Sequence, residues 1–188
     1  MAAAGNVIDL GVKSGIEESQ IEESIDASLE APLEGGALER FRRAAELGRD
    51  ILYIGDNAGE IVLDRLLIEV LGPTRVTYAV RGSPVINDAV MADAEASGMT
   101  ALVKVIDSGS DAPGTILTDC SADFRARFRD ADLVLAKGQG NYETLNGVER
   151  RVFFLLRVKC AVVARHVDAQ VGDLVLAENA VGGRREGG

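Results

Sequence analysis

The sequence predicts an α/β fold, a three-layer Rossmann-like sandwich with a mainly parallel sheet preceded by short helices. The first observation is a series of short apolar runs without polar alternation, because strands covered on both faces read as continuous apolar runs. The second is that helical patterns separate these runs, since parallel strands need crossover connections. The third is that 188 residues, 47% of them hydrophobic, suffice for one principal domain with a sizeable core.

Two helices are expected ahead of the sheet. An acidic segment over residues 16–33 and a second segment over residues 37–48 both carry apolar residues at helical spacing. We therefore expect residues 1–48 to form an N-terminal helical segment. Residues 49–180 would form the α/β domain, and residues 181–188 a flexible tail.

The α/β domain is expected to hold five strands with helices between them. The apolar runs that predict strands are residues 51–55, 75–80, 103–107, 131–136 and 151–158. The last of these runs also suits a helix. The helical patterns between the runs are residues 60–73, 85–98 and 121–131. Gly72 and Gly98 stand where a helix C-terminus favours glycine, and Ser121 stands at an N-cap position. Residues 107–119, rich in Gly, Ser and Asp, are expected to form a loop.

Composition and charge exclude several classes of protein. The net charge is −10 and the sequence pI is about 4.6, so a nucleic-acid backbone would be repelled and no nucleic-acid partner is expected. The two cysteines lie outside any CxxC pair, which argues against a disulfide framework or a thiolate zinc site and favours an intracellular setting. No apolar run reaches the roughly 20 residues of a membrane span. We expect a cytoplasmic protein with no membrane partner, and its oligomeric state stays open.

Polar side chains follow four of the predicted strands. They are Asp56 and Asn57, then Arg81, Asn87 and Asp88, with Gly82 between them, then Asp107 and Ser108, and finally Lys137 with the segment GQGNYE. In an open parallel sheet, ligands bind at the carboxyl ends of the strands. We therefore expect these residues to meet on one functional rim.

Asp56, Asn57 and Asp88 form the first candidate site. Two carboxylates and one carboxamide are hard oxygen donors, which suit Mg²⁺ or Mn²⁺ with positions left for water or substrate. Asp88 follows Asp56 by one strand-helix-strand unit, which would bring it to the neighbouring loop. The alternative is that these residues cap the helices that follow, as Asx residues at strand ends commonly do. Both roles can be filled at once.

The segment KGQGNYETL is the second candidate site. Gly138 and Gly140 would let the backbone approach a ligand. Asn141 could begin a helix whose free N–H groups face an anion, and Lys137 would add a positive charge. The segment matches neither the Walker A motif nor the dinucleotide fingerprint. A glycine turn with a snorkelling lysine is an equal alternative.

Glu60, His166 and the two cysteines are expected to be structural. Glu60 lies in the first turn of its helix, where it complements the helix dipole, although it could also act on a metal-bound water. His166 lies away from every predicted strand end, so a packed or surface role is expected and Ser-His-Asp chemistry is disfavoured. Cys120 and Cys160 are expected to pack as small hydrophobes.

Three segments taken together resemble the domain-of-unknown-function-89 family, the metal-dependent damage-control phosphatases. They are ILYIGDNAGEIVLDRLL, RGSPVINDA and ADLVLAKGQGNYETL, and AAGNVIDLGV near the start is similar to a further segment of that family. The resemblance covers most of the chain, from Gly5 to about Leu176. Simpler relatives carry a helical region ahead of the GNVID segment, often with a CxxC pair. We therefore expect residues 1–48 to be the remnant of such a region.

The resemblance implies a phosphatase acting on small phosphorylated metabolites, such as sugar phosphates or phosphopantetheine-like compounds, with a divalent metal (Mg, Mn, Co or Ni). Carried over by motif, Asp56, Asn57 and Asp88 would hold the metal. Lys137 would bind the phosphate. The further residues expected around the phosphate or substrate are Asn6, Arg81, Gly138, Gly140 and Asn141.

The expected reaction is hydrolysis of a phosphate ester with water as the acceptor. The metal would polarise the phosphoryl oxygens, while Lys137 and the amides of residues 138–141 would neutralise developing charge. Whether an aspartate first takes the phosphoryl group stays open. The alternative function is a non-catalytic Rossmann-like nucleotide- or phosphate-binding module whose rim residues are only caps. A scaffold that uses the acidic residues 16–33 as an interaction surface is a third possibility.

Overall fold

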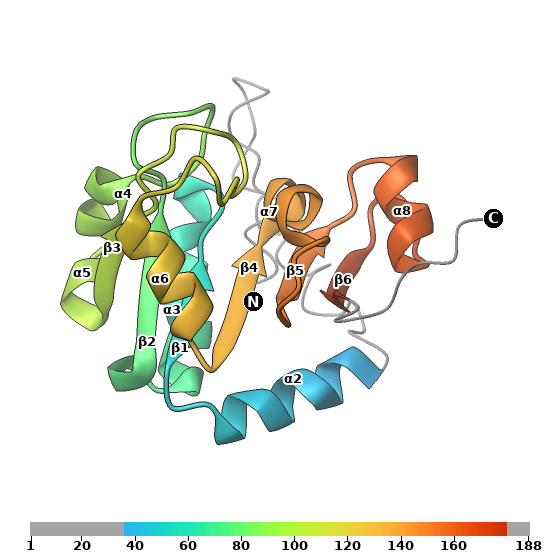
Figure 1. Ribbon diagram of the computed structural model, residues 1–188, viewed down its shortest axis with the longest axis horizontal. Helices are drawn as coiled ribbons and strands as arrows, with labels where there is room; N and C mark the ends of the chain where they lie inside the picture. Colours follow the sequence, from blue (N-terminus) through green and yellow to red (C-terminus); the bar gives the residue numbers. More distant parts are fainter. Residues whose placement is uncertain (1–35, 180–188) are drawn as a thin grey trace, which may run out of the picture.

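The computed structural model describes residues 36–179. The helix predicted over residues 16–33, Asn6 and the tail predicted over residues 181–188 therefore lie outside the described residues. Within the described part, a six-stranded sheet forms the centre, in the order β3-β2-β1-β4-β5-β6 (Figure 1). Its strands are β1 (Ile51–Ile54), β2 (Val76–Val80), β3 (Lys104–Asp107), β4 (Leu133–Lys137), β5 (Phe153–Arg157) and β6 (Leu174–Glu178). The first five pair in parallel, and β6 pairs antiparallel with β5.

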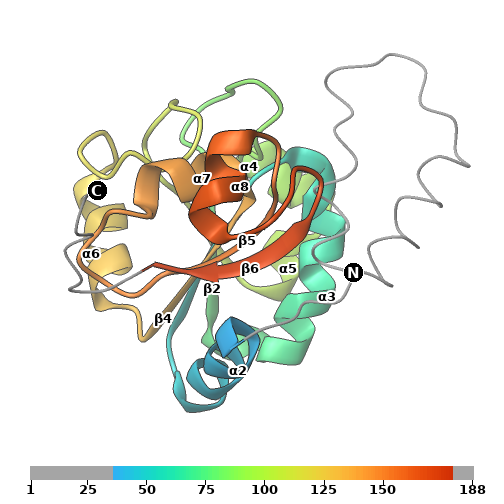
Figure 2. The ribbon, with the colours of Figure 1, turned by 90° about the vertical axis from the view of Figure 1, so that its right-hand side faces the viewer.

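Helices cover both faces of the sheet, which gives the three layers predicted (Figure 2). The helices whose side chains pack on one face are α2 (Gly36–Leu47), α3 (Ile61–Leu71), α4 (Met91–Ala96) and α5 (Met99–Leu102). Those on the other face are α6 (Ala122–Asp130), α7 (Gly138–Leu145) and α8 (Ala161–Val167). None of the helices in residues 36–179 is long and apolar enough to cross a membrane.

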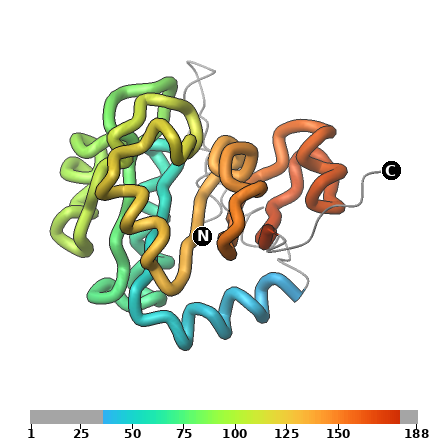
Figure 3. Tube along the Cα trace, in the orientation of Figure 1, coloured from blue at the N-terminus to red at the C-terminus, as the bar shows by residue number. Residues whose placement is uncertain are grey.

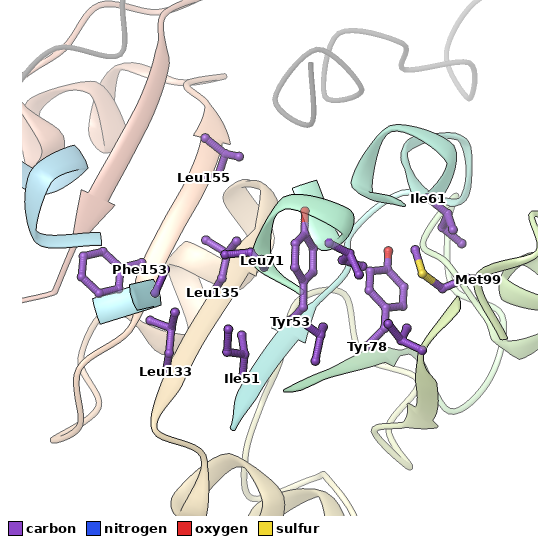
Figure 4. Close-up of a cluster of buried hydrophobic side chains, with 14 of the residues drawn as sticks. Ile51, Tyr53, Ile61, Leu71, Tyr78, Met99, Leu133, Leu135, Phe153 and Leu155 are labelled. Carbon is purple, nitrogen blue, oxygen red and sulfur yellow. The ribbon is translucent and has the colours of Figure 1, made fainter. Parts of the chain in front are cut away.

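Two hydrophobic cores lie against the two faces of the sheet. Ile51 and Tyr53 of β1 point into the core under α2 to α5, whereas Leu52 and Ile54 point into the core under α6 to α8. This alternation follows from the two-residue period of a strand. Figure 4 shows the first core, in which the ring of Tyr53 lies beside that of Tyr78. Every residue of β1 is buried, as its continuous apolar run predicts.

The α/β class and the five predicted strands are confirmed, and residues 153–157 form a strand rather than a helix. Strand β6, which follows α8, was missed; it is a half-buried edge strand that pairs antiparallel with β5. The helix predicted from residue 85 begins only at Met91. Ser121 is an N-cap as predicted, since its hydroxyl accepts a hydrogen bond from Phe124 N at 3.1 Å. Helix α7 begins at Gly138, earlier than predicted.

The order of the strands places a topological switch point between β1 and β4. From β1 the chain passes to β2 and β3 on one side, and then crosses to β4 on the other side of β1 (Figure 3). Loops that follow the two strands diverge there and leave room for a ligand. Asp56 follows β1 and Gly138 follows β4, so the two sites predicted from the sequence meet at this point.

Candidate active site

The backbone beyond β1 and β2 brings Asp56, Asn57 and Asp88 together. Asn57 and Asp88 form an isolated antiparallel bridge. Ala89 N donates a hydrogen bond to Asp56 O at 2.7 Å, and Arg81 N donates to Ala89 O at 2.8 Å. These bonds hold the loop after β2 against the end of β1. The helix predicted from residue 85 therefore begins only after this loop, at Met91.

The three predicted metal ligands line one cavity of about 280 Å³. Asp56 is only 8% exposed and Asn57 only 5%, so both are largely withdrawn from bulk water. The remaining walls come from loops after the strands and from the start of α7. These lining residues are Ile86, Asn87, Pro113, Gly114, Gln139, Gly140 and Lys159. The cavity thus lies at the rim predicted from the sequence.

Helix capping does not account for Asn57 or Asp88. Asn57 stands before a short 3₁₀ helix but makes no side-chain capping bond. Its Nδ2 donates to Glu60 Oε1 at 3.0 Å instead. At the start of α4 the N-cap residue is Val90, whose N–H donates to Asp93 Oδ2 at 2.9 Å. The helix-capping alternative therefore fails for both residues.

Arg81 holds Asp88 from inside the protein. Its side chain is 2% exposed, and its Nε donates to Asp88 Oδ2 at 2.6 Å. Nη1 donates to Thr115 Oγ1 at 3.1 Å, and Nη2 donates to Asn141 Oδ1 at 3.2 Å. Asp56 Oδ1 lies 4.0 Å from Nη2. Arg81, predicted to contact substrate, therefore points its guanidinium at protein groups and fixes the two carboxylates.

Lys137 is the centre of a second buried network. Its side chain is 0% exposed, and Nζ donates to Glu60 Oε2 at 2.7 Å and to Asp64 Oδ1 at 2.8 Å. Asp64 also accepts hydrogen bonds from the hydroxyls of Tyr53 at 2.7 Å and Tyr78 at 2.8 Å. The snorkelling alternative is wrong, because the ammonium group does not reach solvent. Nor does Lys137 line the cavity, so a direct contact with phosphate requires another geometry than the one described.

Helix α7 starts directly against Asp56. Gly138 has φ +79°, and a Cβ at this position would lie 1.8 Å from Asp56 Oδ2, so only glycine fits. Asn141 lies in the first turn, is fully buried, and donates to two backbone carbonyls. Among the residues predicted to form a phosphate cradle, Gly140 lines the cavity. Gly138 and Asn141 shape the wall behind it.

The cluster carries an excess of negative charge. Its ionisable side chains, each 10% exposed at most, are the carboxylates of Asp56, Glu60, Asp64 and Asp88 and the cations Arg81 and Lys137. With all four carboxylates ionised, they would leave two negative charges beyond the two cations in a buried place. Burial, followed by the charges of Glu60 and Asp88, raises the pKa of Asp56 from 3.8 to about 7. A bound cation would relieve this repulsion, since buried charges are normally paired or bound to metals.

The donor atoms that face the cavity suit a hard divalent metal. Asp56 and Asp88 offer carboxylate oxygens, and Asn57 retains its Oδ1 because Nδ2 is used by Glu60. No group of three His, Cys, Asp or Glu side chains in residues 36–179 is placed to hold a metal. The carboxamide oxygen would therefore be the third protein donor, and the residues present fit such an ion.

Lys159 is a charged cavity residue that the sequence analysis missed. It lies two residues beyond β5 and is exposed, and its N–H donates to Gln139 Oε1 at 2.8 Å. The signal was present, since Lys159 follows a strand as the other rim residues do. Because residues 151–158 suited either a strand or a helix, the end of a strand before Lys159 was not recognised.

Of the residues expected to be structural, His166 and Cys120 lie where predicted, Cys160 is half-buried, and Glu60 belongs to the buried network of Lys137. His166 is exposed on α8. Cys120 is buried, its thiol donates to Ile116 O at 3.3 Å, and burial raises its pKa to about 11. The thiol is therefore protonated at neutral pH, as suits a packing role.

A family model for the damage-control phosphatase ARMT1-like domain matches residues 1–175. The chain belongs to this family. A relative in Pyrococcus horikoshii, named a damage-control phosphatase, is 37% identical over 95% of this chain and 63% of its own length. An uncharacterized protein of Methanocaldococcus jannaschii is 40% identical over 92% of this chain and 59% of its own length. A damage-control phosphatase of Archaeoglobus fulgidus is 32% identical over 93% and 62%.

A crystal structure supports the same membership of the damage-control phosphatase family. The structure, of a DUF89 family protein from Pyrococcus horikoshii, matches with a TM-score of 0.84 and 37% identity over 95% of this chain and 64% of that one. The resemblance and the fold predicted from the sequence are thereby confirmed. The chain spans about three-fifths of the length of the curated relatives that it matches.

The raised pKa of Asp56 predicts how the stability of the metal-free protein depends on pH. Between the ordinary pKa of 3.8 and about 7, the unfolded chain releases the proton that the folded protein keeps. The free energy of unfolding should therefore fall as pH rises from 4 to 7. Asp56→Asn removes this part of the dependence, which urea unfolding in EDTA at a series of pH values would measure. The pKa of Glu60 is also raised by burial, so the variant's curve should be flatter rather than flat.

The control is Asp111→Asn, at an exposed position of the loop after β3. Its free energy of unfolding should depend on pH as that of the wild type does. If the free energy of unfolding of Asp56→Asn fell with pH as steeply as that of the wild type, the electrostatic description of the cluster would be contradicted.

Proposed function

We propose that this chain hydrolyses phosphate monoesters of small metabolites with the help of a divalent metal. One observation carries the proposal. A buried set of oxygen donors, in which two carboxylates share one arginine, faces the same cavity as the start of α7 and Lys159. The names of the relatives from Pyrococcus horikoshii and Archaeoglobus fulgidus support a phosphatase. These relatives are longer than this chain. Their activity is therefore assigned to this chain only as part of the proposal.

Asp56, Asn57 and Asp88 would hold the metal. When bound, a divalent cation supplies positive charge that stabilises the phosphoryl oxygens during transfer. Arg81 fixes Asp88 through its 2.6 Å bond, and the close contact with Gly138 fixes Asp56. Such fixed carboxylates need little reorganisation during the reaction, which favours catalysis.

Lys159 would be the cation that faces the phosphoryl group. It lines the cavity together with Asp56 and Asp88, whereas Lys137 is enclosed between two carboxylates. The N–H groups at the start of α7 add donors on the same wall, as helix N-termini do for anions. In this proposal the phosphate-binding role predicted for Lys137 passes to Lys159.

A second cavity offers space for the organic part of the substrate. It has a volume of about 480 Å³ and shares Asn57, Ile86, Asn87 and Asp88 with the first. Its own walls include Pro84, Val85 and Val90. Pockets of a few hundred Å³ suit small ligands, so a sugar phosphate or a phosphopantetheine-like compound fits this space.

The proposal predicts phosphate release that depends on added metal. Protein treated with EDTA should be inactive on a panel of sugar phosphates and an aryl phosphate. Mg²⁺, Mn²⁺, Co²⁺ or Ni²⁺ should restore activity. Asp88→Asn, which keeps the size of the side chain but weakens the donor, should lower kcat/KM at least about 100-fold, whereas Asp111→Asn should not. Folded wild-type protein that binds phosphate compounds but never releases phosphate would favour the non-catalytic binding module.

Lys159→Met should lower kcat/KM about 10- to 100-fold. The reason is the loss of a hydrogen bond to a charged group, which contributes ~1.5–3 kcal/mol. The matched control is Lys104→Met, at an exposed lysine that begins β3 on the opposite edge of the sheet, and its kinetics should be those of the wild type. Equal kcat/KM for both variants would show that the phosphoryl group meets another cation.

A further inference from the structure

Glu60 links the candidate metal site to the buried lysine. It is 0% exposed, and both of its carboxylate oxygens have defined partners. Oε1 accepts from Asn57 Nδ2 at 3.0 Å, and Oε2 accepts from Lys137 Nζ at 2.7 Å. Glu60 itself does not line the cavity. Its position therefore suits action through Asn57 rather than contact with a substrate.

The rest of the network fixes Glu60 in place. Lys137 is shared between Glu60 and Asp64, and Asp64 is held by two tyrosine hydroxyls. Glu60 and Asp64 lie one helical turn apart after β1, whereas Lys137 ends β4. The network thus joins the two strands that flank the switch point.

A gain in stability is a weak explanation of such a buried network. Replacing a buried ion pair by packed apolar side chains is often neutral or stabilising. A buried polar network can instead select one arrangement of the groups that it contacts. Asn57 is the group at the end of this network that reaches the cavity.

The orientation of the Asn57 carboxamide decides what it can bind. A carboxamide turned by 180° keeps nearly the same shape but exchanges an oxygen for an NH₂ group. An ionised carboxylate only accepts hydrogen bonds, so Glu60 selects the NH₂ group of Asn57. The oxygen of Asn57 is then left for the cavity. Without Glu60, the NH₂ group could turn toward Asp56 and Asp88.

We propose that Glu60, held by Lys137 and Asp64, is a positioning residue that turns the carboxamide oxygen of Asn57 toward the metal. The inference rests on the metal site of the proposed function. Asn57 is a metal ligand only in one of its two orientations, and the buried network chooses that orientation.

Glu60→Gln tests the choice of orientation. The introduced carboxamide can accept from Lys137 with its oxygen, which leaves its NH₂ group facing the NH₂ group of Asn57. Asn57 should then turn over and present NH₂ to the metal. We expect Mn²⁺ affinity, measured by electron paramagnetic resonance titration, to fall about 10- to 100-fold, the usual effect of removing such a supporting partner.

The double variant Asn57→Asp with Glu60→Gln is the matched rescue. The carboxamide introduced at position 60 can now donate to the carboxylate introduced at position 57, so the hydrogen bond returns with donor and acceptor exchanged. An oxygen again faces the cavity whichever way the group turns. Mn²⁺ affinity should return to the wild-type value or exceed it.

The outcomes separate this inference from the proposed function. Wild-type protein that binds no Mn²⁺ would overturn the metal site and the inference with it. Wild-type protein that binds Mn²⁺, with equal affinity for Glu60→Gln, would overturn the inference alone. A loss that the double variant does not recover would assign Glu60 a merely structural role.

A measurement on the wild type keeps the inference testable if Glu60→Gln fails to fold. The side-chain NH₂ signals of Asn57 can be followed by nuclear magnetic resonance while Mg²⁺ is added. Their hydrogens should exchange slowly with water in both states, because the bond to Glu60 persists. Fast exchange in the Mg²⁺-bound protein would contradict the inference.

Discussion

The bond of Lys137 to Glu60 and Asp64 is the interaction on which the site depends. It joins the last residue of β4 to the helix that follows β1, with Nζ 2.7 Å and 2.8 Å from the two carboxylates. These strands are neighbours in the sheet but far apart in the chain. Fixing their carboxyl ends fixes the switch point, where Asp56 and Gly138 come into contact. The positions of the cavity walls follow from this one junction.

The negative charges at this junction are only partly neutralised by the two cations. This residual charge has a consequence for function. One lysine between two carboxylates leaves a negative charge, and Arg81 between Asp56 and Asp88 leaves another. The fold holds this excess in the wall of a small cavity and directly behind it, where the side chains are 10% exposed at most. Burial, followed by the charges of Glu60 and Asp88, raises the pKa of Asp56 in this arrangement. A cation in the cavity would supply what the protein groups lack, which connects the packing of the sheet to the proposed chemistry.

The sequence predicted the backbone positions of the site. It did not lead to a correct prediction of where the cationic side chains point. Asp56, Asn57 and Asp88 meet because parallel strands end at one edge, which a pattern of apolar runs reveals. Lys137 was placed correctly at the end of β4. Its side chain, however, shares the strand face of Leu133 and Leu135, which lies toward α3. The two-residue period of the strand contained this information.

Other features depended on contacts that no local pattern records. Arg81 points inward because Thr115 and Asn141, 34 and 60 residues away in the chain, accept its hydrogen bonds. The edge strand β6 pairs antiparallel with β5 and so departs from the parallel pairing of the other strands. Lys159 was missed together with the boundary of β5. For Arg81 and β6 the deciding partner lies elsewhere in the chain, whereas Lys159 carried a local signal at the end of a strand.

The most direct test of this account is a crystal structure of the protein soaked with Mn²⁺, with the ion located by its anomalous scattering. The account predicts a single ion at the switch point, bound by Asp56, Asp88 and the carboxamide oxygen of Asn57, with the Asn57 NH₂ group still on Glu60. An ion bound by other residues, or protein free of Mn²⁺ at a saturating concentration, would contradict it.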